Sequence, residues 1–272
     1  MKINSKKKIY PLVSIIMNCF NGEKYLRQSI QSVINQKYKN WELIFFDNFS
    51  SDKSFSIAKS FKNKKIKLFK SRKYLKLYKA RNIALKKTKG KFITFLDVDD
   101  LWHHSKLKLQ VEYMIKSKKK FVFSNYYLLR GNKKFKSGYL SLFKEGYVTQ
   151  SLLDNYWLGI LTVLMEKKLF KNRKFNSNYE IIGDFDFFVK LSINNYFGYI
   201  NKPLAFYRVH NDNFSQKKID LWIKELKSWI EKNSDILIRK GFNLSKQKRY
   251  LYKLKIKNFF NYVNEKFIFK YI

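Results

Sequence analysis

Three carboxylates within four residues, in the segment Asp97-Val98-Asp99-Asp100, are the strongest candidates for chemistry in this chain. Carboxylates this close repel one another unless a cation neutralises them. Their oxygen atoms suit Mg²⁺ or Mn²⁺, which typically bind one or two carboxylates and fill the other positions with water and substrate phosphates. The same pattern also fits a solvated loop, so the elements on either side must distinguish a metal site from a simple turn.

The acidic segment follows Phe92–Leu96, an apolar run that predicts a buried strand with the carboxylates at its exposed end. Two similar runs, Val13–Asn18 and Trp41–Phe46, predict strands that end at Asn18 and just before Asp47. Other strands are predicted at Ile66–Phe69 and Phe121–Leu129. Helices are predicted at 25–34, 55–61, 77–84 and 105–115. Asp52 and Ser105 are the expected helix N-caps, and Gly90 is an expected helix stop.

Strands that alternate with amphipathic helices predict an α/β fold with a mostly parallel sheet flanked by helices. In such sheets ligands bind beyond the carboxyl ends of the strands. Asn18, Asp47 and Asp97 all lie at predicted strand ends, so we expect them to converge on one crevice. This placement favours a metal site over a solvated loop.

The alternation stops after about residue 130. Gly131-Asn132 predicts a hairpin turn, Leu158–Met165 and Pro203–Tyr207 predict strands, and Asp184–Ser192 predicts a helix. Mixed strand pairing is expected in this region. Beyond residue 216 the apolar spacing is purely helical and predicts two helices, one around 221–230 and one over 251–267.

The composition indicates a folded protein. Of the 272 residues, 45% are hydrophobic and 18% aromatic, enough for a sizeable core and unlike intrinsic disorder. No stretch reaches the roughly 18 consecutive apolar residues of a membrane span. The apolar run near the N-terminus is interrupted by Asn18 and lacks a small-residue cleavage site, which indicates a strand rather than a signal peptide. A single cysteine, Cys19, excludes an intramolecular disulfide and suits the cytoplasm.

The net charge of +38 raises the question of an anionic partner. The excess is overwhelmingly lysine, and Asn, Ile, Phe and Tyr are also abundant; all have A/T-rich codons, so genome composition accounts for much of the bias. Lysine is spread almost evenly, whereas nucleic-acid readers usually cluster arginine beside exposed aromatics, so we expect no nucleic-acid partner. A basic face that meets an anionic membrane or a phosphorylated substrate is the alternative.

Six segments, in order and with ordinary spacing, resemble the motifs of the family 2 glycosyltransferases, which have the GT-A fold. The resemblance begins at that family's opening strand and turn, includes its metal motif, and ends at its Tyr-Arg-X-His segment, covering about residues 11–216. The six segments are Val13–Gly22, Glu42–Asp52, Lys79–Leu85, Phe95–Asp100, Ile182–Leu191 and Pro203–His210.

The resemblance implies a GT-A-type catalytic domain at 11–216, with a nucleotide-binding half at 11–130 and an acceptor half at 131–216, followed by a C-terminal helical extension at 217–272. It implies a nucleotide-sugar donor, with a UDP-sugar favoured. Asp47 is suited to accept a hydrogen bond from the base, and Arg81 to pair with phosphate or with Asp97. The implied donor-binding residues are Asn18, Phe20, Asp47, Arg81 and Asp97.

The resemblance also implies a catalytic metal, Mn²⁺ or Mg²⁺, that takes up charge developing on the leaving diphosphate. Asp99 is the leading ligand, with contributions from Asp100 and His210. Asp184 is the implied general base, which removes the proton of the attacking hydroxyl, and Asp186 is the second candidate. A single displacement of this kind inverts the anomeric carbon.

Three positions depart from the family's motifs. Asn48 and Phe49 stand where the family usually has Asp-Gly, so the loop that reads the base is expected to differ in detail. Gly183 replaces the usual Glu before Asp184, which makes Asp184 the better base candidate. Lys190 replaces the common Arg, which we interpret as a conservative surface or salt-bridge change.

The expected acceptor is a saccharide or lipid-linked saccharide, in surface polysaccharide or glycolipid biosynthesis. Trp157, with Tyr156 and Gly159, either lines the acceptor cleft or packs in the core. The lysine- and aromatic-rich C-terminal helices either lie at the inner face of the cell membrane or pack on the catalytic domain. Two other functions stay open: a nucleotidyltransferase, although Asn21-Gly22-Glu23 is no Gly- and Lys-rich phosphate loop, and a non-catalytic basic protein that binds membrane or nucleic acid.

Overall fold

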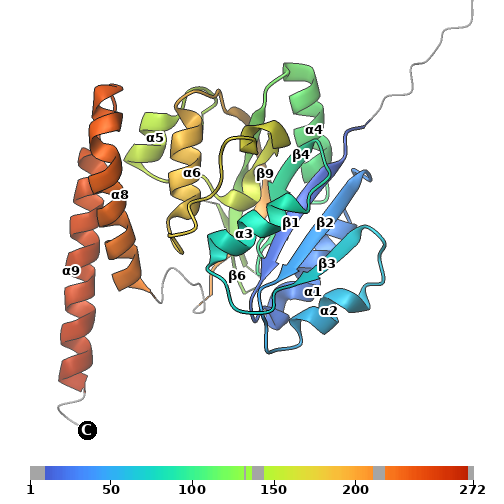
Figure 1. Ribbon diagram of the computed structural model, residues 1–272, viewed down its shortest axis with the longest axis horizontal. Coiled ribbons are helices and arrows are strands. Elements are labelled where there is room, and N and C mark those ends of the chain that lie inside the picture. The colour runs from blue at the N-terminus through green and yellow to red at the C-terminus, as the bar shows by residue number, and fades with distance from the viewer. Residues whose placement is uncertain (1–9, 132, 137–143, 211–217, 269–272) are drawn as a thin grey trace, which may run out of the picture.

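The structure is a computed structural model that describes residues 10–131, 133–136, 144–210 and 218–268, with side chains as far as Phe260. A central sheet is flanked by helices, and two long helices lie side by side at one end of the molecule (Figure 1). The sheet has nine strands in the order β3-β2-β1-β4-β8-β6-β9-β5, with β7 paired to β6.

The first half is the regular alternation that the sequence predicts. β3, β2, β1 and β4 are neighbours and run parallel, and every residue of β1 and β2 is buried, as expected for central strands covered on both faces. The elements are β1 (Val13–Cys19), α1 (Glu23–Ile34), β2 (Trp41–Asp47), α2 (Ser54–Ser60), β3 (Ile66–Lys70), α3 (Leu77–Lys86), β4 (Phe92–Phe95), β5 (Leu101–Trp102), α4 (Lys106–Ser117) and β6 (Phe121–Arg130).

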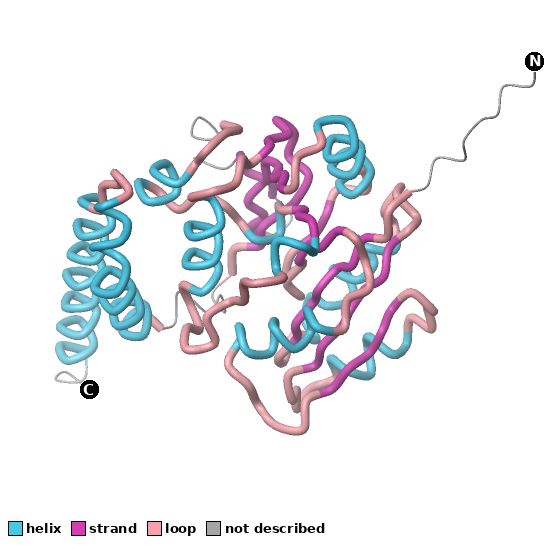
Figure 2. The backbone as a smooth tube through the Cα atoms, turned by 45° about the horizontal axis from the view of Figure 1, so that its top comes forward, coloured by secondary structure: helices cyan, strands magenta, loops and turns pink. Residues whose placement is uncertain are grey.

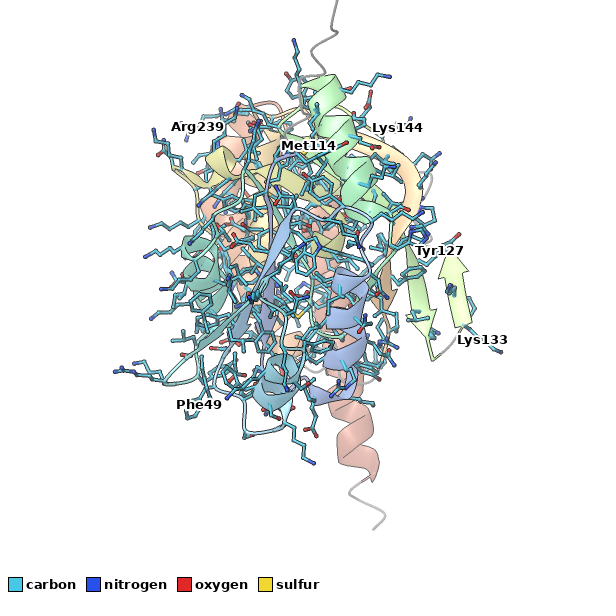
Figure 3. The ribbon with its side chains drawn as sticks, turned by 90° about the vertical axis from the view of Figure 1, so that its right-hand side faces the viewer. Phe49, Met114, Tyr127, Lys133, Lys144 and Arg239 are labelled. Atoms are coloured by element: carbon cyan, nitrogen blue, oxygen red, sulfur yellow. The ribbon has the colours of Figure 1, made fainter. Side chains whose placement is uncertain are left out.

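The second half completes the sheet with mixed pairing, as expected. β8 runs antiparallel between β4 and β6, so β6 keeps the direction of β4, and β9 runs parallel to β6. β7 forms the predicted hairpin with β6, in which Arg130 pairs with Lys133; Asn132 lies outside the described residues. Figure 3 shows this hairpin, labelled at Tyr127 and Lys133, projecting from the body. The elements are β7 (Lys133–Lys136), α5 (Thr149–Asp154), η2 (Ile160–Thr162), β8 (Leu164–Glu166), η3 (Lys167–Phe170), α6 (Gly183–Ser192) and β9 (Gly198–Arg208).

The predicted strand Leu158–Met165 is wrong for most of its length, because only Leu164–Glu166 is a strand. Side chains, rather than a neighbouring strand, take up the carbonyl groups of the preceding turn. Trp102 Nε1 donates to the Leu161 carbonyl and Gln110 Nε2 to that of Thr162, while Thr94 Oγ1 donates to that of Val163. The buried apolar run is therefore a 3₁₀ turn held by its surroundings.

Of two predicted helix signals, Ser105 is confirmed only in position and Gly90 is wrong. Ser105 does occupy the N-cap position of α4, but its hydroxyl caps no backbone N–H and lies 3.0 Å from His104 Nδ1 instead. Gly90 does not end α3, which stops at Lys86. A Cβ at Gly90 would lie 2.6 Å from the Ser14 nitrogen, so the glycine is needed where the chain passes β1. Lys53, rather than Asp52, occupies the N-cap position of α2, although Asp52 Oδ1 accepts the backbone N–H of Ser54, the first residue of the helix.

The C-terminal helices are α8 (Ile219–Arg239) and α9 (Ser245–Ile268), which lie side by side (Figures 1 and 2). α8 packs against the rest of the protein through a buried face that includes Leu226, Trp229, Ile230 and Leu237. In the part of the chain that the structure describes, no helix combines the length and the apolar character needed to cross a membrane.

Candidate active site

The acidic segment forms a turn directly after β4. The Leu96 N–H still bonds to the Ile16 carbonyl of β1, and the chain then turns so that the Asp100 N–H lies 3.2 Å from the Asp97 carbonyl. A Cβ at Gly22, after β1, would lie 2.7 Å from Val98 Cγ2, so the first turn of the protein fits closely under the acidic turn. The strand ends therefore fix the carboxylates as predicted.

Asp97 is paired with Arg81 of α3. The Arg81 Nη2 lies 2.8 Å from Asp97 Oδ1, and Arg81 is only 2% exposed. Its guanidinium lies over the rings of Tyr78, Phe95 and Phe175. Because Arg81 is buried, this pair is no surface salt bridge, and it holds a fixed positive charge behind the acidic turn.

The other two carboxylates of the turn meet the end of β9 and the residues just after it. His210 Nε2 lies 3.0 Å from Asp99 Oδ2, and the Arg208 N–H donates to Asp100 Oδ1 at 2.9 Å. Burial, reinforced by the charge of Asp97, raises the pKa of Asp99; burial and the charges of both neighbours raise the pKa of Asp100 well above its usual range. Crowded, desolvated carboxylates of this kind are stabilised by a cation.

The donor set fits a divalent metal that shares its shell with a ligand. Within the described ranges, no three His, Cys, Asp or Glu side chains form a closed metal cage. Asp99 and His210 nevertheless lie side by side and both are partly exposed. Mg²⁺ and Mn²⁺ are commonly bound by one or two carboxylates plus substrate phosphates, so an open site of this type suits them. Asp100 is 2% exposed, and its role as a metal ligand stays a prediction.

Asp184 lies in the first turn of α6 and is held by two donors. Its Oδ1 accepts the Tyr78 hydroxyl at 3.1 Å and the Phe185 N–H at 2.8 Å. Burial raises the pKa of Asp184, while the nearby Arg81 charge opposes that rise. Burial and the Asp184 charge also raise the pKa of the Tyr156 hydroxyl well above its usual range, so it stays protonated.

The packing around α6 explains why residue 183 is glycine. A Cβ at this position would lie 2.4 Å from the Tyr78 ring, so only glycine admits the tyrosine that hydrogen-bonds to Asp184. Where the family motif usually has Glu, this protein therefore places a phenol beside its candidate base.

Asp186, the second candidate base, is occupied elsewhere. Its Oδ1 accepts Trp229 Nε1 of α8 at 2.8 Å and lies 2.5 Å from Lys190 Nζ. The side chain is buried against α8. The interpretation of Lys190 as a salt-bridge residue is therefore confirmed, and the geometry favours Asp184 over Asp186.

A cavity of about 740 Å³ joins the acidic turn to Asp184. Asp97 and Asp100 lie on its wall together with Asp184, and the predicted acceptor residues Tyr156, Trp157 and Gly159 line it as well. Trp157 is also a core residue, since it is buried and packs on Phe123. The α8 and α9 helices complete the wall with Trp222, Leu226, Lys246, Gln247, Arg249, Tyr250 and Lys253.

Asn18 lies at the end of β1, the strand beside β4, and Asp47 at the end of β2, the next strand of the sheet, but neither lines this cavity. Both side chains are buried, and none of their polar side-chain atoms has a hydrogen-bond partner among the described residues. Buried polar groups nearly always have partners, so an unpaired Asn and an unpaired Asp at the ends of adjacent strands indicate a place where a ligand completes the bonding.

Three aromatic side chains at this edge are exposed. Phe20 is one of them, and its ring packs edge-on against Tyr74 at 4.8 Å. Phe49 has a φ of 70°, a left-handed conformation that glycine adopts readily, which explains the usual glycine at this position of the motif. Figure 3 shows Phe49 at the rim of the molecule. Asn48 exchanges two hydrogen bonds with the Leu75 backbone, so the altered loop is tied to the chain before α3.

Two residues that shape the candidate site, Tyr78 and Glu225, lie outside all six motif segments. Tyr78 stands two positions before the Ala-Arg-Asn motif and three before Arg81, on the same face of the helix, and that spacing is the hint that the sequence offers. Asn82, by contrast, is structural, because its side chain exchanges hydrogen bonds with the Phe175 backbone.

The glycosyl transferase family 2 model matches residues 14–191, more than half of the chain, so the protein belongs to this family. Family membership makes it a glycosyltransferase, rather than a nucleotidyltransferase or a non-catalytic basic protein. It is similar to the *Escherichia coli* UDP-Glc:α-D-GlcNAc-diphosphoundecaprenol β-1,3-glucosyltransferase WfgD, with 38% identity over 158 residues. That match covers 58% of this chain and only 61% of WfgD.

Solved structures support the GT-A fold. S. aureus TarS 1–349 in complex with UDP-GlcNAc aligns with a TM-score of 0.66 and 17% identity, over 80% of this chain and 66% of that one. The mannosyltransferase PcManGT from Pyrobaculum calidifontis, in complex with GDP-Man and Mn²⁺, aligns with a TM-score of 0.62 and 15% identity, over 82% and 65%. At these identities the likeness establishes the fold alone.

Proposed function

We propose that this protein transfers a sugar from a UDP-sugar to a hydroxyl group of a lipid-linked saccharide, with inversion and with a divalent metal. The observation that carries the proposal is the shared cavity: Asp97 of the acidic turn and Asp184 lie on the wall of one 740 Å³ space, with buried Arg81 close to both. One part of this space can hold a leaving diphosphate while another holds the attacking hydroxyl.

The unpaired side chains of Asn18 and Asp47 support a nucleoside beside the cavity. A buried carboxylate without a partner is well placed to accept a base N–H, and uracil carries one next to two acceptor carbonyls. Exposed Phe20 offers a ring face close by. The TarS structure contains UDP-GlcNAc and the name of WfgD specifies UDP-Glc, which is why we favour UDP over other nucleotides.

Asp99 and His210 are the side chains that would hold the metal, with Asp100 supporting them from the buried side. When bound, Mn²⁺ or Mg²⁺ supplies Lewis-acid stabilisation of the leaving diphosphate. The PcManGT complex contains Mn²⁺, which supports the same metal here. Arg81 orients Asp97 from behind through their ion pair.

Asp184 would accept the proton of the attacking hydroxyl as its oxygen bonds to the anomeric carbon and the bond to the donor phosphate breaks. Tyr78 and the Phe185 N–H orient the carboxylate through Oδ1, which leaves Oδ2 to face the acceptor. The base and the leaving group lie on opposite sides of the sugar in this arrangement, so the anomeric configuration inverts.

The acceptor and the cellular setting follow from the relatives and the surface. WfgD acts on a diphosphoundecaprenol-linked sugar according to its name, and we extend that class of acceptor, and a role in surface polysaccharide or glycolipid synthesis, to this protein. Peripheral contact of the basic C-terminal helices with the inner face of an anionic membrane belongs to the same proposal, as does the division into a catalytic domain at 11–216 and a helical extension at 217–272.

The test is a donor screen followed by a product analysis. UDP, GDP and several UDP-sugars are added with and without Mn²⁺, and the melting temperature is recorded, since ligand binding raises apparent stability. We expect UDP compounds to stabilise the protein only with metal. The stabilising sugar donor is then incubated with GlcNAc-diphosphate-lipid, and NMR of the product should show the inverted anomer. Equal stabilisation without metal, or a retained anomer, would contradict the proposal.

A further inference from the structure

The C-terminal helix α9 contributes one continuous face to the candidate active-site cavity. Lys246, Arg249, Tyr250 and Lys253 all line it, and their spacing of three, four and seven residues places them on the same side of the helix. The wall opposite the acidic turn and Asp184 is therefore basic and aromatic, and it lies on a helix outside the segment that the family model matches.

This face has a fixed position. Gln247 of α9 is buried and donates from Nε2 to the Leu153 carbonyl of α5, and Leu254 is buried about two turns further on. Lys246 Nζ lies 3.6 Å from Asp154 Oδ2, also on α5. These contacts attach α9 to the acceptor side of the protein, so its cations hold their place relative to the cavity.

Among the described residues, two of the three cations on this face have no acidic partner. Lys246 is partly neutralised by Asp154, whereas neither Arg249 nor Lys253 forms an ion pair with any residue that the structure describes. Between them lies Tyr250, whose ring meets that of Trp222 of α8 at 5.9 Å. Adjacent guanidinium and ammonium groups beside aromatic rings suit a phosphate group that is attached to an apolar chain.

We propose that Arg249 and Lys253 bind the diphosphate that links the acceptor sugar to its lipid carrier. The inference rests on the proposed function, because it assumes that the acceptor occupies this cavity. The donor diphosphate is accounted for separately by the acidic turn and its metal. The basic wall thus recognises the second anionic group of the reaction, and selects lipid-linked acceptors over neutral glycosides.

The test uses farnesyl diphosphate, a soluble prenyl diphosphate, as the probe. Its binding to the full chain is measured by isothermal titration calorimetry with UDP and Mn²⁺ already saturating, so that the donor site cannot take the probe. We expect binding to the parent protein and a dissociation constant at least about tenfold higher in the double variant Arg249→Ala, Lys253→Ala. Farnesol, which lacks the diphosphate, should bind both proteins equally weakly.

The matched control is Lys248→Ala, Lys255→Ala, which removes the same charge from exposed positions of α9 that do not line the cavity. Its affinity should stay within about twofold of the parent protein. All the altered side chains are exposed, so melting temperatures should match. An equal loss in the control, an unchanged affinity in the cavity variant, or no binding once UDP is present would overturn the subsite. Failure of UDP itself to bind with Mn²⁺ would instead overturn the proposed function.

Discussion

The donor and acceptor sides of the candidate site both depend on carboxylates, but they position these groups in different ways. On the donor side, the carboxylates follow a strand of a parallel sheet, and neighbouring strand ends supply Asn18 and Asp47. On the acceptor side, Asp184 begins a helix that is preceded by irregular chain, and its surroundings come from α3, α5, α8 and α9. Sheet register positions the first set, and side-chain contacts between distant helices position the second.

This difference predicts separable failures. Changes on the donor side should remove chemistry or nucleotide binding while the fold stays intact, because the backbone there is fixed by strand pairing. Changes that loosen the acceptor side should weaken turnover and stability together, because the same side chains serve both.

Asp99→Ala should have the largest effect. It removes a proposed metal ligand and leaves His210 without its carboxylate partner. We expect turnover of the UDP-sugar to fall by about 10⁴-fold, corresponding to several kcal/mol of lost charge stabilisation. The measurement is the initial rate with saturating Mn²⁺, together with the melting temperature of the variant without ligand. Undiminished turnover in a folded variant would remove Asp99 from the mechanism.

Asp184→Asn should come next, with a loss of about 10³-fold in turnover, within the roughly 10²–10⁴-fold range of general-base catalysis. UDP binding should be unchanged, because the amide disturbs only the acceptor side. Dissociation constants for UDP, measured beside the rates, separate this variant from Asp99→Ala. A comparable loss of UDP affinity would contradict the assignment to the acceptor side.

The ionisation of Asp184 also predicts how the transfer rate depends on pH. Only the ionised carboxylate can accept a proton, and burial raises the pKa of Asp184. The rate should therefore fall with decreasing pH, beginning at a higher pH than for an ordinary carboxyl group. The residual rate of Asp184→Asn, followed over the same pH range with a stable fold, should lack this acid limb. Persistence of the limb would assign it to another group.

Asp47→Asn tests the nucleotide end of the donor side. A hydrogen bond to a charged group typically contributes about 1.5–3 kcal/mol, so the dissociation constant for UDP should rise at least about tenfold. The turnover number at saturating donor should change little. The same substitution should have a smaller effect on GDP, whose base offers a different edge. Equal weakening of both nucleotides would indicate a structural role for Asp47.

The donor side was largely predictable from the sequence because its signals are local. An apolar run followed by carboxylates predicts both a strand and the place where it ends. This prediction is confirmed for Phe92–Leu96, where β4 ends just before Asp97. The acceptor side was less predictable, because its structure depends on contacts between distant residues. Leu158–Met165 has the composition of a strand, yet Trp102 and Gln110 hold its carbonyls in a turn. No local pattern encodes such contacts.

Glu225 is the clearest example of a long-range contact that no local pattern predicts. This buried residue of α8 accepts the backbone N–H groups of Glu180, Ile181 and Ile182, at 2.6, 3.0 and 3.1 Å, just before α6 begins. The loop that leads to Asp184 is therefore capped by a side chain from the C-terminal helices. The family model ends at residue 191, before this helix begins.

Glu225→Ala should have only a modest effect on chemistry and the largest effect on stability. Three backbone donors lose their acceptor, and each unsatisfied group costs about 1–3 kcal/mol, so the free energy of unfolding should fall by about 3 kcal/mol or more. Turnover should fall about tenfold while UDP affinity stays constant, because only the base is displaced. Denaturant unfolding and steady-state kinetics measure the two effects.

Glu231→Ala is the matched control, since Glu231 lies on the same helix and is exposed, with a 3.8 Å ion pair to Lys227. Exposed pairs of this type contribute under about 1 kcal/mol, so this variant should keep its stability and turnover. If Glu225→Ala lost stability but kept full turnover, α8 would support the fold without positioning Asp184. If both effects appear together, the helical extension is part of the acceptor site, and the donor side remains the only part that the parallel sheet positions by itself.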